Sequence, residues 1–393
     1  MTYKKYRLED LCEFIKNGKS VQQTKDQKGL PITRIETIAN SVIDPAKVGY
    51  ANLALEGNES YLLKNGDILF SHINSVEHLF KTAKYDGIPE QLIHGMNLLC
   101  LRPNVKLINP QFFLHLLRSD NVKRGLLTYA NKSVNQASIS ATSVKNFEVN
   151  IPSLEEQRRI ASILDKADAI RQKRQQAIAK LDELLQTTFI DMFGDPVSNP
   201  KKLKLQKLSE VGNISTGNTP SRADEDNYGD FIEWIKSDNL NHDYDIATQA
   251  SEYLSEKGKQ KGRVVPPGSI LVTCIAGSLS CIGNLAIVDR EVTFNQQINS
   301  ITPNEDIQTE YLYYLLKVSK PIIQSFSTNS MKGMISKSTF SQIELPIAPS
   351  EQQLKFVDIF NKFSELKNKA NKELFELNNL FSGLQQKAFN GTL

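Results

Sequence analysis

The stretch "IPSLEEQRRIASILDKADAI" at residues 151–170 recurs as "APSEQQLKFVDIFNKFSEL" at residues 348–366. Gln157 aligns with Gln353, an offset of 353 − 157 = 196 residues, and the alignment continues without a gap beyond these stretches. In both copies apolar residues alternate at spacings of three and four, which is typical of an amphipathic helix with one narrow apolar stripe. The sequence therefore predicts two long helices that repeat each other.

Start and stop signals support these two helices. Each start has the spacing of a capping box, in which a serine oxygen accepts a bond from an early backbone N–H and a side chain three residues later reaches back, here Ser153 with Glu156 and Ser350 with Gln353. Gly194 and Gly391 lie where glycine often ends a helix. We expect long helices within residues 153–194 and 350–393, each roughly 50 to 60 Å long at 1.5 Å per residue.

The apolar stripes of the two helices have the a/d spacing of a coiled-coil seam. Because the copies are alike, we expect them to pack as an antiparallel coiled coil about a pseudo-two-fold axis. Arg174 and Glu373 interrupt the stripe, and polar residues at such positions fix the alignment of two helices. The predicted seam consists of Ile160, Ile163, Ala167, Ile170, Leu181 and Leu184 in the first helix and Phe356, Ile359, Phe363, Leu366, Leu377 and Leu380 in the second.

The segments between the helices repeat more faintly. "NGDILFS" at 65–71 resembles "PGSILVT" at 267–273, and "QFFLHLLRS" at 111–119 resembles "EYLYYLLKV" at 310–318, in the same order in both halves. Short alternating apolar runs bounded by Gly, Pro and Asn predict strands, with helices at the leucine pairs. We expect an α+β fold, with mixed α/β domains at residues 1–152 and 195–349, followed by long helices at 153–194 and 350–393.

Composition limits the class of protein. A length of 393 residues favours two domains, and 40% hydrophobic with 23% charged residues is typical of a globular protein. The first residues, "MTYKKYRLED", lack the apolar region of a signal peptide, so we expect a cytoplasmic protein without a membrane role. The four cysteines and five histidines show no C-x-x-C or H-E-x-x-H spacing, and we expect no metal site. A formal charge of +3 neither supports nor excludes DNA binding.

Two like domains held apart by long helices suit a bipartite linear target. Duplex DNA presents its grooves at intervals of roughly 34 Å. Because the loops of the two domains have diverged, we expect an asymmetric target with two different half-sites. The alternative, common for heptad helices, is a non-catalytic coiled-coil adaptor that binds proteins only.

Several strings together carry a resemblance to a known family. They are the two helix starts already quoted, "STGNTPSR" at 215–222, "FIEWIKSDNL" at 231–240, "NQQINSI" at 295–301 and "LQQKAFNGTL" at the end of the chain. Their order resembles that of the specificity (S) subunit of type I restriction-modification systems over nearly the whole chain. The first domain has no equivalent of "TPSR" or "WIK".

The resemblance implies a DNA-reading subunit with two target recognition domains and no catalytic centre of its own. It also implies two methyltransferase subunits that bind S-adenosylmethionine, and restriction/translocase subunits that use ATP, so no cofactor is expected in this chain.

The residues agree with a non-catalytic role. "SNPKK" at 198–202 lacks the aromatic residue of an N-P-P-[YF] methylation motif, and "NGKS" at 17–20 lacks the first glycine of a phosphate loop because Glu13 occupies that place. A self-sufficient methyltransferase would need a Gly-rich cofactor loop, which we do not find. We therefore predict no catalytic, cofactor-binding or metal-binding residues.

DNA contacts need basic and hydroxyl side chains for phosphates, and Arg, Asn or Gln for base edges. Loop segments rich in both are our candidates. In the first domain they are Lys19, Gln22, Gln23, Lys25, Asn131, Lys132, Asn135 and Gln136. In the second domain they are Thr219, Ser221, Arg222, Lys236, Ser237, Asn239, Ser278, Asn329, Ser330 and Lys332.

Overall fold

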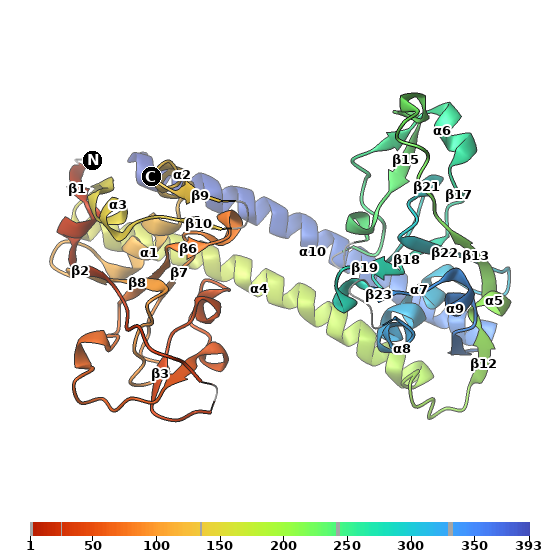
Figure 1. Cartoon of the computed structure of the whole chain (residues 1–393), viewed down its shortest axis with the longest axis horizontal. Helices are drawn as coiled ribbons and strands as arrows, with labels where there is room; N and C mark the ends of the chain where they lie inside the picture. The colour runs from red at the N-terminus through yellow and green to blue at the C-terminus, as the bar shows by residue number, and fades with distance from the viewer. Residues whose placement is uncertain (1–2, 25, 134–135, 241–243, 329–332) are drawn as a thin grey trace. The chain divides into compact units, whose positions relative to one another are not determined.

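The computed structural model describes residues 3–24, 26–133, 136–240, 244–328 and 333–393. The chain divides into two compact units (Figure 1). Unit 1 contains Met1–Gln175 and Lys372–Leu393, and unit 2 contains Gln176–Asn371. Each unit therefore combines one globule with part of each long helix.

The long helices are α4 (Leu154–Phe193) and α10 (Ser350–Asn390). Their 40 and 41 residues correspond to roughly 60 Å each at 1.5 Å per residue. Gly194 and Gly391 follow them with φ of 82° and 79°, the left-handed conformation that glycine adopts without strain at a helix C-terminus. The predicted helix ends are confirmed.

Unit 1 is built on a four-stranded antiparallel sheet in the order β2 (Cys12–Asn17), β8 (Leu98–Pro103), β5 (Ile68–Ser71) and β7 (Thr82–Lys84). Smaller sheets pair β1 (Lys4–Arg7) with β11 (Glu148–Ile151), β3 (Leu30–Ile32) with β4 (Gly49–Ala51), and β10 (Ala137–Ser138) with both β6 (Ile73–Asn74) and β9 (Asn131–Lys132). The short helices are α1 (Pro110–Arg118), α2 (Asp120–Leu127) and α3 (Ala141–Asn146).

Unit 2 has a four-stranded antiparallel sheet in the order β13 (Gly212–Thr216), β22 (Ile298–Pro303), β18 (Ile270–Thr273) and β20 (Leu285–Ile287). A five-stranded sheet follows the order β14 (Tyr228–Gly229), β16 (Tyr253–Leu254), β15 (Ile232–Ile235), β21 (Val292–Phe294) and β17 (Val264–Val265). The two remaining pairs join β12 (Lys204–Lys207) to β24 (Glu344–Ile347) and β19 (Ile275–Ala276) to β23 (Gly333–Met334). The short helices are α5 (Leu208–Val211), α6 (Glu256–Lys261), α7 (Thr309–Val318), α8 (Lys320–Ser325) and α9 (Lys337–Ser341).

The same strand order recurs in the two units. β2–β8–β5–β7 in unit 1 corresponds to β13–β22–β18–β20 in unit 2, and β1–β11 corresponds to β12–β24. In both, the last strand of the pair leads directly into a long helix. Mixed α and β content in two repeated units agrees with the predicted fold class.

Inside each unit the long helices run antiparallel. In unit 1, Arg159 donates to the Leu393 carbonyl at 3.0 Å, Arg171 to Asn378 at 2.7 Å, and the predicted pair Arg174 and Glu373 lie 2.5 Å apart. In unit 2, Lys367 lies 2.8 Å from Asp182, and the Phe356 ring of α10 lies 5.1 Å from the Phe189 ring of α4. Residue numbers rise along α4 as they fall along α10, which fixes the direction of the pair in each unit.

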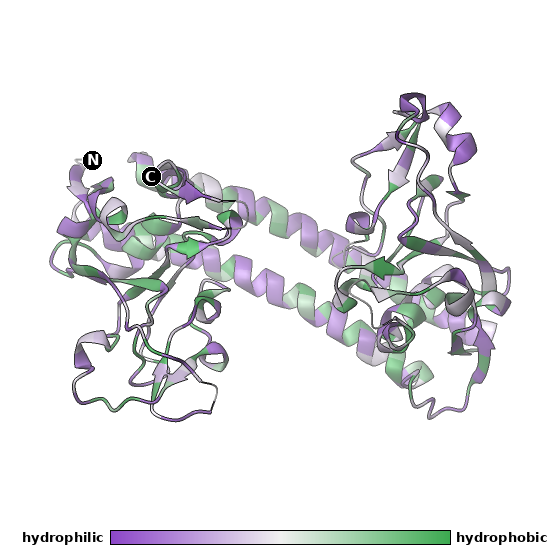
Figure 2. Ribbon diagram, viewed as in Figure 1, coloured by the Kyte–Doolittle hydropathy of each residue, from purple (hydrophilic) through white to green (hydrophobic). Residues whose placement is uncertain are grey.

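The contact line between the helices departs from the predicted seam. Ile160 and Phe356 are buried, and most other predicted seam residues are half-buried. However, four of them are exposed, namely Ile170 (54%), Leu184 (55%), Leu366 (54%) and Leu380 (59%). Figure 2 shows hydrophilic and hydrophobic residues alternating along both helices.

The reason is the period of the helix. Inter-helix or core contacts are made every eleven residues, at 160, 171, 182 and 193 in α4 and at 356, 367, 378 and 389 in α10. Eleven residues in three turns correspond to about 3.67 residues per turn, whereas a heptad corresponds to 3.5, so the two patterns drift apart along the helix. A strict heptad therefore places the four residues off the contact line.

The predicted capping boxes are only partly formed. Ser153 accepts from the Glu156 backbone N–H at 3.4 Å, but the Glu156 carboxylate bonds Arg159 instead. In α10 the helix begins at Ser350 itself, and the Gln353 side chain points into the globule. The second capping box is wrong because Gln353 has stronger partners elsewhere.

Gln157 and Gln353 tie each long helix to its globule. Gln157 accepts from the Asn109 N–H at 2.8 Å and donates to the Pro152 carbonyl at 3.0 Å, while Gln353 accepts from the Gln308 N–H at 2.9 Å and donates to the Ala348 carbonyl at 2.8 Å. Both side chains are buried, and each binds the backbone just before α1 or α7. The same residue thus makes the same junction in both units.

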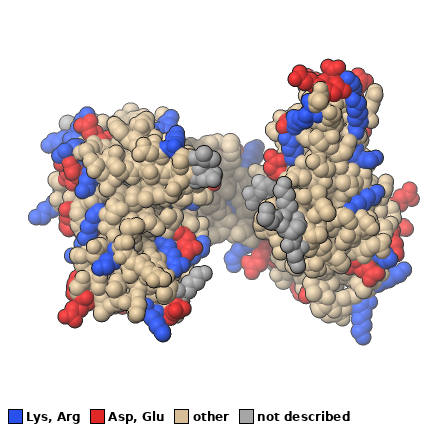
Figure 3. All heavy atoms as spheres, in the orientation of Figure 1, with Lys and Arg blue, Asp and Glu red and all other residues tan. Residues whose placement is uncertain are grey.

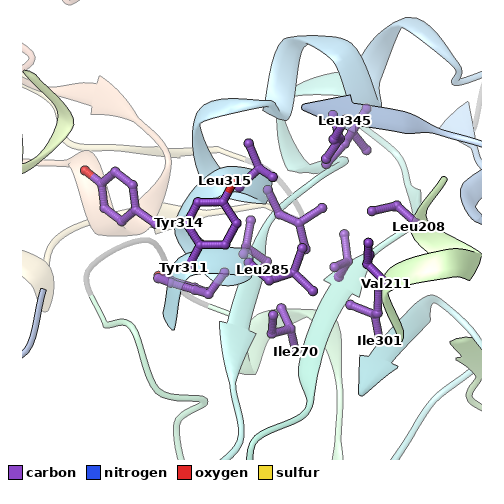
Figure 4. Close-up of a cluster of buried hydrophobic side chains, with 14 of the residues drawn as sticks. Leu208, Val211, Ile270, Leu285, Ile301, Tyr311, Tyr314, Leu315 and Leu345 are labelled. Carbon is purple, nitrogen blue, oxygen red and sulfur yellow. The ribbon is translucent and has the colours of Figure 1, made fainter. Parts of the chain in front are cut away.

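Aromatic residues complete the core around these junctions. In unit 2, Phe189 of α4 lies 5.1 Å from Phe356 of α10 and 5.3 Å from Tyr314 of α7, ring to ring. Figure 4 shows the adjoining cluster, in which Tyr311 and Leu315 of α7 lie against Ile270, Leu285 and Ile301 of the sheet, whereas the Tyr314 ring points away from them. In unit 1, Phe112 of α1 packs on Phe389 of α10 at 5.7 Å.

A glycine follows the first strand of each main sheet. A Cβ at Gly18 would lie 2.1 Å from the His94 carbonyl oxygen, and one at Gly217 would lie 2.2 Å from the Asn295 carbonyl oxygen. The next residue makes an equivalent backbone bond in both units, from Lys19 to His94 at 2.8 Å and from Asn218 to Phe294 at 3.0 Å. Residues 19–23 and 218–222 are therefore equivalent loops.

We predict that Gln353→Ala lowers the free energy of unfolding by about 2 kcal/mol, because it leaves a buried carbonyl and a backbone N–H without partners. Urea unfolding of the full chain measures the change. The matched control is Gln352→Ala, since Gln352 is exposed and one residue away. Equal effects of the two substitutions would contradict the junction.

We predict that Gly217→Ala lowers the free energy of unfolding by about 2 kcal/mol, because a methyl group there must displace backbone. Gly277→Ala is the control, since a Cβ at Gly277 meets nothing within 4 Å. Thermal unfolding compares the two variants. An unchanged free energy of unfolding in Gly217→Ala would mean that the loop backbone accommodates the methyl group, which would contradict the prediction.

Candidate nucleic-acid interface

The loop after β13 is pinned to its own unit. The Thr219 hydroxyl donates to Gln296, and the Asn227 side chain donates to the Ser221 carbonyl at 3.0 Å. Thr219, Ser221 and Arg222 are all exposed. The loop therefore presents three of the predicted DNA contacts on a fixed backbone.

The structure brings Arg222 and Lys236 together in what we name the recognition cluster: Arg222, Tyr228, Trp234, Lys236 and Glu252. Arg222 lies 2.7 Å and Lys236 2.5 Å from the Glu252 carboxylate. The Arg222 guanidinium lies 4.5 Å from the Tyr228 ring centre, and the Lys236 ammonium 5.2 Å from that of Trp234. Two predicted residues thus form one basic and aromatic surface.

The Glu252 carboxylate and the Arg222 guanidinium each favour the charged form of the other. Hydrogen bonds from Lys236 and Arg222 hold the pKa of the Glu252 carboxyl below its ordinary value. The bond to Glu252 likewise raises the pKa of Arg222. The cluster contains two basic side chains and one carboxylate, so its formal charge is +1.

Asn239 takes a structural role instead of the predicted DNA contact. Only 8% of it is exposed, and its oxygen accepts from the Lys236 backbone N–H at 3.0 Å. Its amide donates to Thr248 at 3.2 Å and to the Gln249 carbonyl at 3.0 Å. Because its polar atoms are used inside the unit, Asn239 has no group left for a base.

Two predicted serines, Ser237 and Ser278, lie on separate turns of unit 2. The Ser237 hydroxyl donates to Gln297 at 3.5 Å, close to Lys236 in the chain. Ser278 is exposed and accepts from the Ser280 backbone N–H at 3.3 Å, on the turn that follows β19. Five further predicted contacts lie outside the described residues: Lys25, Asn135, Asn329, Ser330 and Lys332.

Unit 1 has a cleft of about 690 Å³ beside the equivalent loop. Arg34 lies in it, donating to Gln23 at 2.9 Å and lying 3.3 Å from Glu36. The cleft is lined by Val21, Gln23, Arg34, Ile35, Glu36, Ala39, Asn74, His78, Lys81 and Asn97. Of the predicted residues, Gln23 is the one in its lining.

The other predicted residues of unit 1 lie around this loop and on β9. Gln22 is exposed, and the Lys19 ammonium lies 5.3 Å from the Tyr61 ring centre. Asn131 and Lys132 are exposed on β9, which pairs with β10, and β10 pairs in turn with β6, the strand of Asn74. Gln136 is exposed just before β10. The sheet therefore links this segment to a strand that lines the cleft.

Arg34 is the counterpart of Lys236. Each follows a short strand, and its backbone N–H bonds the side chain three residues on, Thr37 at 2.8 Å and Asn239 at 3.0 Å. Gln23 and Arg222 occupy the same place in the two equivalent loops. Unit 1 therefore has residues in the same structural positions as "TPSR" and "WIK", although its sequence contains no such strings. The positions are kept while the residue types change.

Sequence reasoning missed Arg34, Trp234 and Glu252. Arg34 could have been found, since 236 − 34 = 202 equals the offset between "NGDILFS" at 65–71 and "PGSILVT" at 267–273. Glu252 carries no such signal, because it is sixteen residues from Lys236 in the chain and meets it only in the folded sheet.

Charges of both signs lie side by side at the end of unit 2 that carries α6 (Figure 3). Asp224 lies 3.0 Å from both Lys257 and Lys261. Such pairing agrees with the small formal charge of +3. Within the described part of the chain no three His, Cys, Asp or Glu side chains gather as a metal site would require. No helix there is long and apolar enough to cross a membrane.

Comparisons with known proteins agree on one family. The model of the type I restriction modification DNA specificity domain matches twice, over residues 1–180 and 200–376. A putative type I restriction enzyme MjaX specificity subunit of Methanocaldococcus jannaschii is 33% identical over 94% of this chain and 91% of its own length. The HindI specificity subunit of Haemophilus influenzae is 27% identical over 83% and 87%.

Solved structures share the fold. The S subunit of a type I restriction-modification system from M. genitalium superposes with a TM-score of 0.56 at 15% identity, covering 99% of this chain and 96% of its own. A chain from a study of complex assembly and conformational transition in a type I system gives 0.55 at 18% identity, covering 100% and 98%. The two specificity domains span most of the sequence, and the chain therefore belongs to the type I restriction-modification DNA specificity family.

Proposed function

We propose that the chain is the DNA-recognition subunit of a type I restriction-modification complex, with each domain reading one half of an asymmetric bipartite site. The observation that carries this proposal is the pair of equivalent loops with different chemistry. Gln23 and Arg34 in unit 1 stand where unit 2 has Arg222 and Lys236. Because Gln suits adenine and Arg suits guanine, the two units favour different bases.

The same proposal assigns the long helices the role of a spacer. Residues 153–194 and 350–393 would form an antiparallel coiled coil about a pseudo-two-fold axis, holding target recognition domains 1–152 and 195–349 at a set distance. The antiparallel contacts inside each unit support this role. The helices would then determine the length of DNA between the half-sites.

Catalysis would reside in partner subunits. We propose that two methyltransferase subunits bring S-adenosylmethionine, and that restriction/translocase subunits use ATP, in the cytoplasm where the DNA is accessible. The exposed apolar residues Ile170, Leu184, Leu366 and Leu380 are candidates for the methyltransferase contact, because no seam covers them. This chain would contribute recognition and assembly without a catalytic residue.

Selection from a randomised duplex pool tests the function. We predict that the full chain with its methyltransferase enriches two sequence blocks separated by a spacer of fixed length. The logarithm of the affinity should fall linearly with the logarithm of the salt concentration, with a slope of about −0.9 per neutralised phosphate. A protein-only adaptor would enrich no sequence and show no such slope, which would refute the proposal.

Lengthening both helices tests the spacer. We predict that inserting about 22 residues, two eleven-residue periods, at matched places in α4 and α10 adds about 33 Å and lengthens the preferred spacer by about ten base pairs, one turn of DNA. The control is an eleven-residue insertion, which adds about half a turn of DNA and should abolish joint recognition. An unchanged spacer after the longer insertion would contradict the role of the helices.

A further inference from the structure

Glu252 is a carboxylate in the middle of a surface proposed to bind DNA. Its two oxygens take different partners, Arg222 at 2.7 Å and Lys236 at 2.5 Å. Its backbone is fixed as well, because its carbonyl accepts from the Trp234 N–H at 3.0 Å. The carboxylate is therefore held where both basic side chains reach it.

The support beneath the two basic groups is rigid. Trp234 is buried, and its indole N–H donates to the Asn218 carbonyl at 3.2 Å. The Arg222 guanidinium lies 4.5 Å from the Tyr228 ring centre and 5.5 Å from that of Trp234. Arg222 is thus confined by a ring below and a carboxylate beside it, which removes side-chain freedom before any ligand arrives.

Stability does not account for the arrangement. The side chains of Arg222 and Glu252 are 58% and 36% exposed, and ion pairs so exposed contribute little to folding. A carboxylate on this surface also repels phosphates, which weakens binding to any DNA. The arrangement benefits recognition only if orientation of the basic groups matters more than their charge.

We propose that Glu252 is a positioning residue for base recognition in unit 2, and this inference rests on the proposed function. It holds Arg222 and Lys236 so that their donors meet the O6 and N7 acceptors of guanine in the major groove. Its negative charge at the same time lowers affinity for the backbone of unrelated DNA. Glu252 therefore lowers the affinity for DNA of any sequence and raises the preference for guanine.

Unit 1 fixes its counterpart differently. Arg34 is held by Gln23 at 2.9 Å and by Glu36, which lies in the short helix (Ile35–Ile38) that Arg34 precedes. The carboxylate beside Arg34 therefore comes from its own neighbourhood in the chain, whereas Glu252 is 30 residues from Arg222. The half-site of unit 1 consequently serves as an internal control for changes at Glu252.

The test is Glu252→Gln in the full chain with its methyltransferase, selected against the randomised duplex pool. Preference for guanine in the half-site of unit 2 should fall by about tenfold, the value of one good base contact. Affinity for duplexes lacking the site should rise, and the half-site of unit 1 should stay unchanged. Glu351→Gln is the matched control, since Glu351 also pairs with a lysine but lies on the first turn of α10.

Each other outcome overturns the inference in a distinct way. Full preference retained in both half-sites would overturn the role of Glu252 and leave the proposed function standing. Loss of both half-sites with a lower thermal midpoint would show a purely structural role. No sequence preference in the unaltered chain would overturn the proposed function and this inference with it.

Discussion

The bond from a buried glutamine amide to the backbone beside it is the constraint on which the rest of the structure depends. Gln157 and Gln353 each join the first turn of a long helix to the segment before α1 or α7. His115 of α1 also bonds Asp165 of α4 at 2.8 Å, but the glutamine bond is made in the same way in both units. It holds the first turn of each helix against a defined backbone N–H, which apolar packing cannot do because that packing is not directional.

The candidate sites of the two units follow one plan with different residues. A glycine that touches backbone sets the loop, the loop carries Gln23 or Arg222, and a basic residue after a short strand stands opposite. The scaffold keeps these positions while the side chains vary. Under the proposed function, such a separation means that a new base preference requires no new fold.

The sequence predicted the long helices and their ends well, because the repeat, the glycines and the apolar spacing are all local signals. It predicted the seam less well, since Ile170 and Leu366 fit a heptad that the contacts between the helices do not follow. Among the site residues, Arg222 and Lys236 could be found as basic loop residues. Glu252 could not, because its role arises from strand pairing that brings distant residues together, and Asn239 was misassigned because burial cannot be read from residue type.

The composition of unit 1 from both ends of the chain has a consequence for synthesis. Residues 1–175 leave the ribosome first, yet Ala388 and Phe389, which complete their core, leave only after all of unit 2. Tyr3 donates to the Ala388 carbonyl at 2.8 Å, and this bond cannot form until that part of the chain has been made. Unit 2 is contiguous and has all its residues earlier, so the domain made second is the first that can finish folding. Removing the end of α10 would therefore leave the core of unit 1 incomplete.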